Sequence, residues 1–223
     1  MFPIRDDAPH ATTPFVTYFL IGLNTLVFLW ELIQGPVVIK TFAFIPSSVD
    51  AWLAGTATAA QALVPLFTSM FLHGSWLHLI FNMWGLAIFG DNVEDRLGHF
   101  GYLLFYLACG LGAGLTQFLF NLHSRVPTLG ASGAIAGVMG AYFLLFPTAR
   151  VLTWFLFFVF WLPAWLVLGY WFVVQFLSGA ATAISETQQS GGVAVWAHVG
   201  GFLTGILLIK LLPARKASYS LES

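Results

Sequence analysis

Charged residues are scarce in this 223-residue chain: only 8% are Asp, Glu, Lys or Arg, whereas 59% are hydrophobic. Soluble globular domains carry about 25% charged and about 45–50% apolar residues, so this chain has too little charge for a water-facing surface. Its eight basic and nine acidic residues give no positive field that would attract a phosphate backbone. These shortages exclude a soluble enzyme, a disordered chain and a nucleic-acid partner. They indicate a multi-pass membrane protein.

Cysteine is nearly absent as well. The single Cys109 permits no disulfide within the chain, so the sequence leaves the redox compartment open. We expect its thiol to lie in the core. Long apolar runs are abundant instead.

Six apolar stretches suit helices that cross a bilayer, because about 20 residues span roughly 30 Å of hydrocarbon. They are Phe15–Gln34, Leu66–Gly90, Phe100–Leu122, Ser132–Pro147, Val151–Ala180 and Val193–Leu212. The fourth is short and begins in a Gly-Ala-Ser-Gly run, which predicts a helix that starts inside the protein. The sequence thus predicts an all-α, six-helix membrane domain over residues 14–212, with polar tails at residues 1–13 and 213–223.

Two features interrupt this pattern. Pro65 and His73 lie near the start of the second stretch, so regular helix should begin only around Ser75. The longest connection is Gly35–Pro65. Its semi-apolar part, residues 42–53, is expected to lie in the membrane interface rather than to cross it.

The basic residues predict an orientation. With the N-terminus inside, six crossings return the C-terminus to the same side, and basic residues should be enriched there. Six then lie in the cytoplasm and two outside; the six are Arg5, Arg96, Arg150, Lys210, Arg215 and Lys216, and the two are Lys40 and Arg125. We therefore expect both termini in the cytoplasm.

Polar side chains within apolar stretches are costly and by default mark function. The candidates are His73, His78, Asn82, Ser132 and His198. His78 and Asn82 are four residues apart, so both project from one face of a helix. The second, fourth and sixth helices all begin outside in this topology. His78, Ser132 and His198 should therefore lie at comparable depth in the outer half of the membrane.

Each candidate also has a purely structural interpretation. Ser132 could bond its own backbone carbonyl, and His198 could be a packing or channel-lining histidine. His78 and Asn82 could join helices by hydrogen bonds. Three histidines could bind zinc, but their spacing is not His-Glu-x-x-His, and we expect no metal.

Small residues favour close helix packing. Gly201 and Gly205 follow His198 as Gly-x-x-x-Gly, a spacing that lets a neighbouring backbone approach closely. Gly133, Gly137 and Gly140 do something similar on the helix that begins at Ser132. The helices that carry the serine and the histidine could therefore come within hydrogen-bond reach of one another.

Serine hydrolase chemistry fits these residues. A serine near a helix N-terminus has backbone N–H groups beside it that can stabilise an oxyanion, and a histidine on a facing helix can take its proton. Asn82 and His78 supply side-chain donors to the same oxyanion. No Asp or Glu is expected at the depth of His198, so Ser132 and His198 would form a dyad.

Three motifs resemble the rhomboid intramembrane serine proteases. They are His73-Gly-Ser-Trp-Leu-His78-Leu-Ile-Phe-Asn82-Met, Gly130-Ala-Ser132-Gly-Ala, and Ala197-His198-Val-Gly-Gly201-Phe-Leu-Thr-Gly205. The run Gly90–Gly98 also resembles the family's loop between the second and third helices. The resemblance extends from about Phe15 to Leu212.

The resemblance implies roles for single residues. Ser132 is expected to be the nucleophile and His198 the general base and acid. Asn82, His78 and the Ser132 backbone N–H would surround the oxyanion, with His73 structural or water-holding. Gly130, Gly133, Gly201 and Gly205 are expected to be structural near the site, and Glu94 structural on the cytoplasmic side.

The resemblance also implies how such an enzyme works. It would cut single-span membrane proteins in or near their spans, without a cofactor, in what we expect to be a bacterial plasma membrane. The segment Ser178–Gly192 has the composition of a flexible cap over the site. One departure is Ala136: relatives often carry an aromatic residue there that stacks on the histidine, so we expect the orientation of His198 to be less tightly specified.

Two other classes remain as alternatives. A catalytically dead rhomboid-like protein would bind membrane clients, but such relatives characteristically lose the serine or the histidine, and both are present here. A small transporter or channel would need polar residues along a path through both leaflets, whereas the candidates cluster in the outer half.

Overall fold

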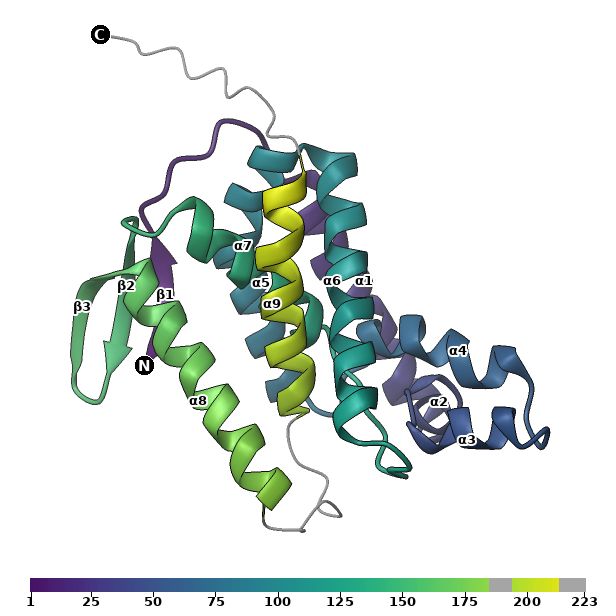
Figure 1. The fold of residues 1–223 in the computed structure, drawn as a ribbon. Coiled ribbons are helices and arrows are strands. Elements are labelled where there is room, and N and C mark those ends of the chain that lie inside the picture. Colours follow the sequence, from purple (N-terminus) through teal and green to yellow (C-terminus); the bar gives the residue numbers. More distant parts are fainter. Residues whose placement is uncertain (185–193, 213–223) are drawn as a thin grey trace, which may run out of the picture.

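The computed structural model describes residues 1–184 and 194–212, and Figure 1 shows an upright helix bundle with a small sheet at one side and short helices at one end. The elements in chain order are β1 (Phe2–Asp6), α1 (Phe15–Gln34), α2 (Val37–Phe42), α3 (Ser47–Leu53), α4 (Ala59–Thr68), the 3₁₀ turn η1 (Ser69–Phe71), α5 (Trp76–Leu97), α6 (His99–Phe120), α7 (Ser132–Leu145), β2 (Arg150–Phe155), β3 (Phe158–Pro163), α8 (Ala164–Ile184) and α9 (Val195–Leu211).

The chain is a mostly helical membrane protein. Within the described residues, α1, α6 and α8 are long and apolar enough to cross a bilayer. A fourth span is possible if α4–η1 and α5, which meet at a bend of 74°, count as one. α7 and α9 are apolar but shorter, at 14 and 17 residues. These helices give three or four spans by length and composition, and the count of six stays a prediction.

The all-α prediction is wrong in one region, because the stretch Val151–Ala180 is not a single helix. Its first part forms the hairpin β2–β3, which pairs Phe155 with Phe158 across a two-residue turn. Only from Ala164 does α8 begin. A short run of β-branched and aromatic residues suits a buried strand as well as a helix, and hydrophobic periodicity alone does not separate the two.

Residues 1–13 are not simply a polar tail, since β1 pairs antiparallel with β2 to complete a three-stranded sheet. Arg150 donates from its peptide N–H and from Nε to the carboxylate of Asp7, and both donor–acceptor distances are 2.7 Å. These bonds hold the pKa of Asp7 below its ordinary value. The Tyr142 hydroxyl donates to Asp6, and the Trp84 indole donates to the carbonyl of Pro3. The N-terminal strand is thus fastened to the sheet, to α7 and to α5.

Polar contacts also fix both ends of α5. As predicted, its regular helix begins next to Ser75, whose hydroxyl accepts the N–H of His78 as an N-cap. Its other end differs from prediction, because Gly90–Gly98 is not a loop. Helix continues to Leu97, and Gly98, with φ 72°, separates α5 from α6.

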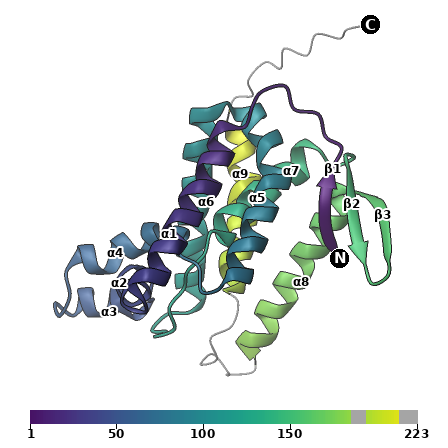
Figure 2. The same cartoon turned by 180° about the vertical axis from the view of Figure 1, so that it is seen from behind.

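The connection Gly35–Pro65 contains the short helices α2 and α3 and most of α4, which lie beside one end of the bundle in both views (Figures 1 and 2). Thr58 and Gln61 form a capping box at the start of α4. The location of residues 42–53 in the membrane interface stays a prediction.

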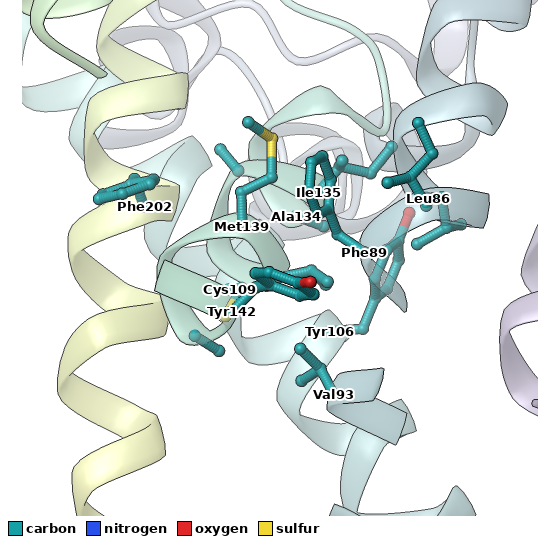
Figure 3. Packing of buried hydrophobic residues seen from close by; sticks show 14 of the residues in the cluster. Leu86, Phe89, Val93, Tyr106, Cys109, Ala134, Ile135, Met139, Tyr142 and Phe202 are labelled. Carbon is teal, nitrogen blue, oxygen red and sulfur yellow. The ribbon is translucent and has the colours of Figure 1, made fainter. Parts of the chain in front are cut away.

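The helix α7 occupies the centre of the bundle. Ten consecutive residues, Gly133 to Tyr142, are buried, and large side chains of α5, α6 and α9 pack around them (Figure 3). Phe89 meets Tyr142 edge to face with ring centroids 5.0 Å apart. Cys109 lies in this core, as expected. Ser132, the first residue of this 14-residue helix, is half-buried and stands directly before the buried part.

The buried carboxylate of Glu94 joins α1, α5 and α6 at the end of the bundle opposite α2–α4. Glu94 of α5, fully buried, accepts the N–H groups of Val16 and Thr17 at 2.8 Å and the Thr17 hydroxyl at 2.7 Å. These N–H groups belong to the first turn of α1 and have no partner within their own helix. Nδ1 of His99, in α6, lies 2.6 Å from Oε1 of the same carboxylate. Glu94 therefore caps α1 and ties it to α5 and α6.

We expect Glu94→Ala to lower the free energy of unfolding by about 3–5 kcal/mol, because two backbone N–H groups and the Thr17 hydroxyl lose their acceptor and each buried donor left without a partner costs about 1–3 kcal/mol. Glu94→Gln keeps one acceptor oxygen and should lose less. Denaturant unfolding in detergent micelles measures both. The control is Asp50→Ala, since the Asp50 side chain is 40% exposed and its carboxylate pairs with the exposed His123; equal losses in the two alanine variants would contradict the role of Glu94.

Candidate active site

Ser132 is the first residue of α7, and the backbone before it requires a glycine. Gly130 has φ 126°, a conformation that residues with side chains rarely adopt. A Cβ atom at Gly130 would also lie 2.7 Å from the ring of His78. This glycine lets the chain turn into α7 while the imidazole stays close, and Ser132 stands beside the free N–H groups of the helix N-terminus.

Two glycines of α9 bring it against α7. A Cβ atom at Gly201 would lie 2.0 Å from the carbonyl oxygen of Gly133, and one at Gly205 would lie 1.9 Å from that of Gly137. Both distances are far below van der Waals contact, so the helices touch through backbone atoms. His198 lies one turn before Gly201. Its Nε2 comes within 2.8 Å of the Ser132 hydroxyl oxygen.

The other side of the His198 ring is held from α8. Its Nδ1 lies 2.9 Å from Oε1 of Gln175, and the Trp171 ring lies 5.6 Å away, tilted by 39°. Ala136 offers no ring, as the sequence indicates. Two side chains of α8 contact the imidazole instead, and the effect of Ala136 on the orientation of His198 stays a prediction.

The side chains of His78 and Asn82 share one cavity with the serine and the histidine. The cavity has a volume of about 610 Å³ and is also lined by residues 126–129. The Asn82 side chain is buried, and its Nδ2 has no hydrogen-bond partner among the described residues. The structure thus brings together four predicted side chains: Ser132, His198, His78 and Asn82.

His73 lies behind this group rather than in it. It is buried, its ring is 5.1 Å from that of His78, and neither ring nitrogen has a partner among the described residues. Its peptide N–H donates to Oε1 of the Glu31 carboxylate at a distance of 3.0 Å. His73 is therefore placed to support His78.

A second cavity of about 350 Å³ reaches Ser132 and His198 from the side of α5. The first three residues of the chain line it, together with aromatic side chains of α5 and Trp171. Phe2 packs against Phe81 and Trp84. The serine and the histidine thus lie between two cavities.

Sequence reasoning missed three residues of this region: Gln175, Trp171 and Glu31. The sequence indicates two of them, because Gln175 and Glu31 are polar residues within apolar stretches, as the candidate histidines are. Trp171 and Gln175 are also one helical turn apart. In the predicted cap Ser178–Gly192, residues 178–184 form the end of α8, and the remainder lies outside the described residues.

Comparisons with known proteins agree with this architecture. The rhomboid-domain family profile matches residues 60–215. The mitochondrial rhomboid protein 1 of Saccharomyces cerevisiae is 30% identical over 198 residues, which cover 86% of this chain and 51% of that protein. The rhomboid protease GluP of Bacillus subtilis is 33% identical over 129 residues, which cover 57% of this chain and 24% of that protein. The chain spans about half the length of these relatives or less. It belongs to the rhomboid family.

The glycine contact can be tested with Gly201→Ala. The added methyl group has no space against the Gly133 carbonyl, and such overpacking costs about 1–3 kcal/mol of stability. It should also move His198 away from Ser132, where a displacement of about 1 Å costs on the order of 100-fold in rate. Thermal unfolding and labelling by a fluorophosphonate measure the two effects.

Gly22→Ala is the matched control for this variant. Gly22 also lies in a helix, but a Cβ atom there would meet nothing within 4 Å. It should unfold and react like the unchanged protein. Equal behaviour of Gly201→Ala and Gly22→Ala would mean that close contact of α7 and α9 is not required.

Proposed function

We propose that the protein is an intramembrane serine endopeptidase that hydrolyses peptide bonds in or near the transmembrane segments of other membrane proteins. The observation that carries this proposal is the 2.8 Å contact between Ser132 Oγ and His198 Nε2 beside a cavity. Membership of a family that includes the rhomboid protease GluP supports it.

The reaction is an acyl transfer in two stages. Ser132 Oγ attacks the carbonyl carbon of the scissile bond while His198 Nε2 takes the hydroxyl proton. His198 then gives this proton to the leaving amine as the acyl-serine forms. A water molecule, deprotonated by the same Nε2, attacks the ester carbonyl; the acyl–Oγ bond then breaks, His198 returns the proton to Ser132 Oγ, and the second product leaves as the acid. No cofactor takes part in any step.

Neutral donors stabilise the oxyanion in this scheme. The unpartnered Nδ2 of Asn82 is buried in the cavity that the serine lines. A buried donor without a partner costs free energy, so such donors are rare in folded proteins and call for an explanation such as a catalytic role. The His78 ring lines the same cavity. The backbone N–H of Ser132 lies at the N-terminus of α7, where the helix dipole favours negative charge.

The membrane arrangement is also part of the proposal. We take α1, α5, α6, α7, α8 and α9 as six spans and a single-span membrane protein as the substrate. Arg96 and Lys210 lie in the last turns of α5 and α9, and both helices end at the side of the bundle opposite α2–α4 (Figure 1). We therefore assign that end to the cytoplasm, and the location of both termini there stays a prediction. Relatives are named as mitochondrial and chloroplastic as well as bacterial, and the bacterial plasma membrane stays a prediction.

Ser132→Ala and His198→Ala test the nucleophile and the base. Both should abolish cleavage of a panel of single-span membrane proteins, read by mass spectrometry of the fragments, and labelling by a fluorophosphonate. Ser47→Ala and His10→Ala, which lie outside both cavities, serve as controls and should react normally. A Ser132→Ala protein that still cleaves would refute the nucleophile, and full labelling of His198→Ala would reduce this histidine to a packing role.

Asn82→Ala separates the oxyanion role from a structural one. Loss of an oxyanion donor costs on the order of 100–1,000-fold in turnover, whereas a hydrogen bond that only joins helices contributes about 0.6 kcal/mol of stability. We expect a folded protein that labels slowly and cleaves far more slowly. The control is Asn24→Ala, whose amide donates to the Leu20 carbonyl within α1. Near-normal turnover in folded Asn82→Ala would rule out the oxyanion role.

A further inference from the structure

The contact between Gln175 and His198 has a chemical consequence beyond packing. Oε1 of Gln175 is 2.9 Å from Nδ1 of His198, and Ser132 Oγ is 2.8 Å from Nε2 of the same ring. The imidazole is therefore engaged at both nitrogens at once, by two different helices. A side chain at the second nitrogen has the geometric place of the third member of a catalytic triad.

We propose that Gln175 is a positioning residue that fixes the tautomer and the orientation of His198, so that the site is a Ser-His-Gln triad rather than a dyad. This inference rests on the proposed function. An amide oxygen accepts hydrogen bonds only, so Nδ1 must carry the proton in this contact. Nε2 is then unprotonated and directed at the Ser132 hydroxyl, which is the state that a general base requires.

The absence of a carboxylate at this place has a physical reason. The His198 side chain lies within the helix bundle and is only 7% exposed, and an ionised group deep in a membrane protein pays a large desolvation cost. A glutamine offers the acceptor oxygen without the charge. When His198 takes the serine proton, the amide dipole also stabilises the imidazolium through the same bond.

A second side chain of α8 makes the arrangement specific. Trp171 precedes Gln175 by one turn and lies 5.6 Å from the His198 ring, so both residues project from one face of the helix. The tryptophan limits tilting of the ring, while the amide fixes its rotation. Both restraints come from α8, whereas Ser132 and His198 belong to α7 and α9.

The tautomer can be measured directly in the full-length protein with ¹⁵N-labelled histidine in detergent, because protonated and bare ring nitrogens give separate resonances. The Ser132→Ala background removes the other partner of the ring. In that background His198 should keep its proton on Nδ1 through Gln175. Adding Gln175→Leu should shift the proton toward Nε2 or mix the tautomers. His198→Ala assigns the signals.

Kinetics provide the second measurement. With Ser132 intact, Gln175→Leu should lower the rate of fluorophosphonate labelling and kcat by about 100-fold, as for a displaced catalytic group. KM should hardly change, since Gln175 lines neither cavity. Gln175→Glu restores an acceptor oxygen and should recover part of the rate. Val173→Leu, at an exposed position of the same helix, should react normally.

The inference is overturned if Gln175→Leu folds, reacts at the normal rate and leaves the tautomer unchanged. Should that variant fail to fold, Gln175→Met replaces it as a second side chain without an acceptor oxygen, its thioether sulfur being only a weak acceptor; its rate and its tautomer then decide in the same way. The tautomer readout does not depend on proteolysis. Failure of the proposed function would appear as cleavage by Ser132→Ala, whereas failure of this inference would leave Ser132→Ala inactive.

Discussion

The backbone contact between α7 and α9 is the constraint on which the rest of the site depends. At Gly133–Gly201 and Gly137–Gly205 one helix rests on the carbonyl oxygens of the other, with no space for even one methyl group. Apolar burial contributes little to helix association in lipid, so close packing of this kind takes over. The 2.8 Å distance between serine and histidine follows from it.

Buried polar groups have different surroundings at the two ends of the bundle. At one end Glu94 accepts bonds from α1 and α6, and Asp95 accepts bonds from Thr12, although Asn92 Oδ1 and the Tyr102 hydroxyl there lack partners among the described residues. At the other end Asn82 Nδ2 lacks a partner among these residues, and so do both ring nitrogens of His73 behind His78. Unsatisfied buried polar atoms are uncommon in folded proteins. Among the side chains of the described residues with such an atom, only Asn82 lines a cavity with Ser132, which favours the oxyanion role proposed for it.

The sequence predicts much of the site because its residues interrupt apolar helices. Polar residues at fixed helical spacing, as in His78 and Asn82, indicate a face, and the glycine pattern after His198 indicates a close neighbour. The chain's shortage of charge predicts a membrane protein in the same direct way. The first two of these inferences depend only on the spacing of residues along a helix, and that spacing fixes which side chains share a face wherever the helix packs.

Other features depend on contacts that no local pattern encodes. The hairpin β2–β3 lies in an apolar run whose composition suits either helix or strand, and pairing with β1, some 150 residues earlier, stabilises the strand. Gln175 lies among bulky apolar residues, and only the crossing of α8 and α9 gives its amide a partner. Residues 90–97 are helical, and their charged side chains find partners far along the chain: Glu94 accepts bonds from α1 and Asp95 from Thr12.

The proposed site is built almost wholly from neutral side chains, and the low dielectric around it explains why. Serine, histidine, asparagine and glutamine place no net charge in the bundle before the reaction begins, whereas a buried carboxylate beside His198 would have to be desolvated first. In such surroundings a fixed neutral dipole interacts more strongly with a developing charge than it does in water. The negative oxyanion and the positive imidazolium then form together. In the proposed mechanism the Asn82 amide faces the first and the Gln175 amide faces the second. A chain that is short of charge can therefore hold a polar reaction within a membrane bundle.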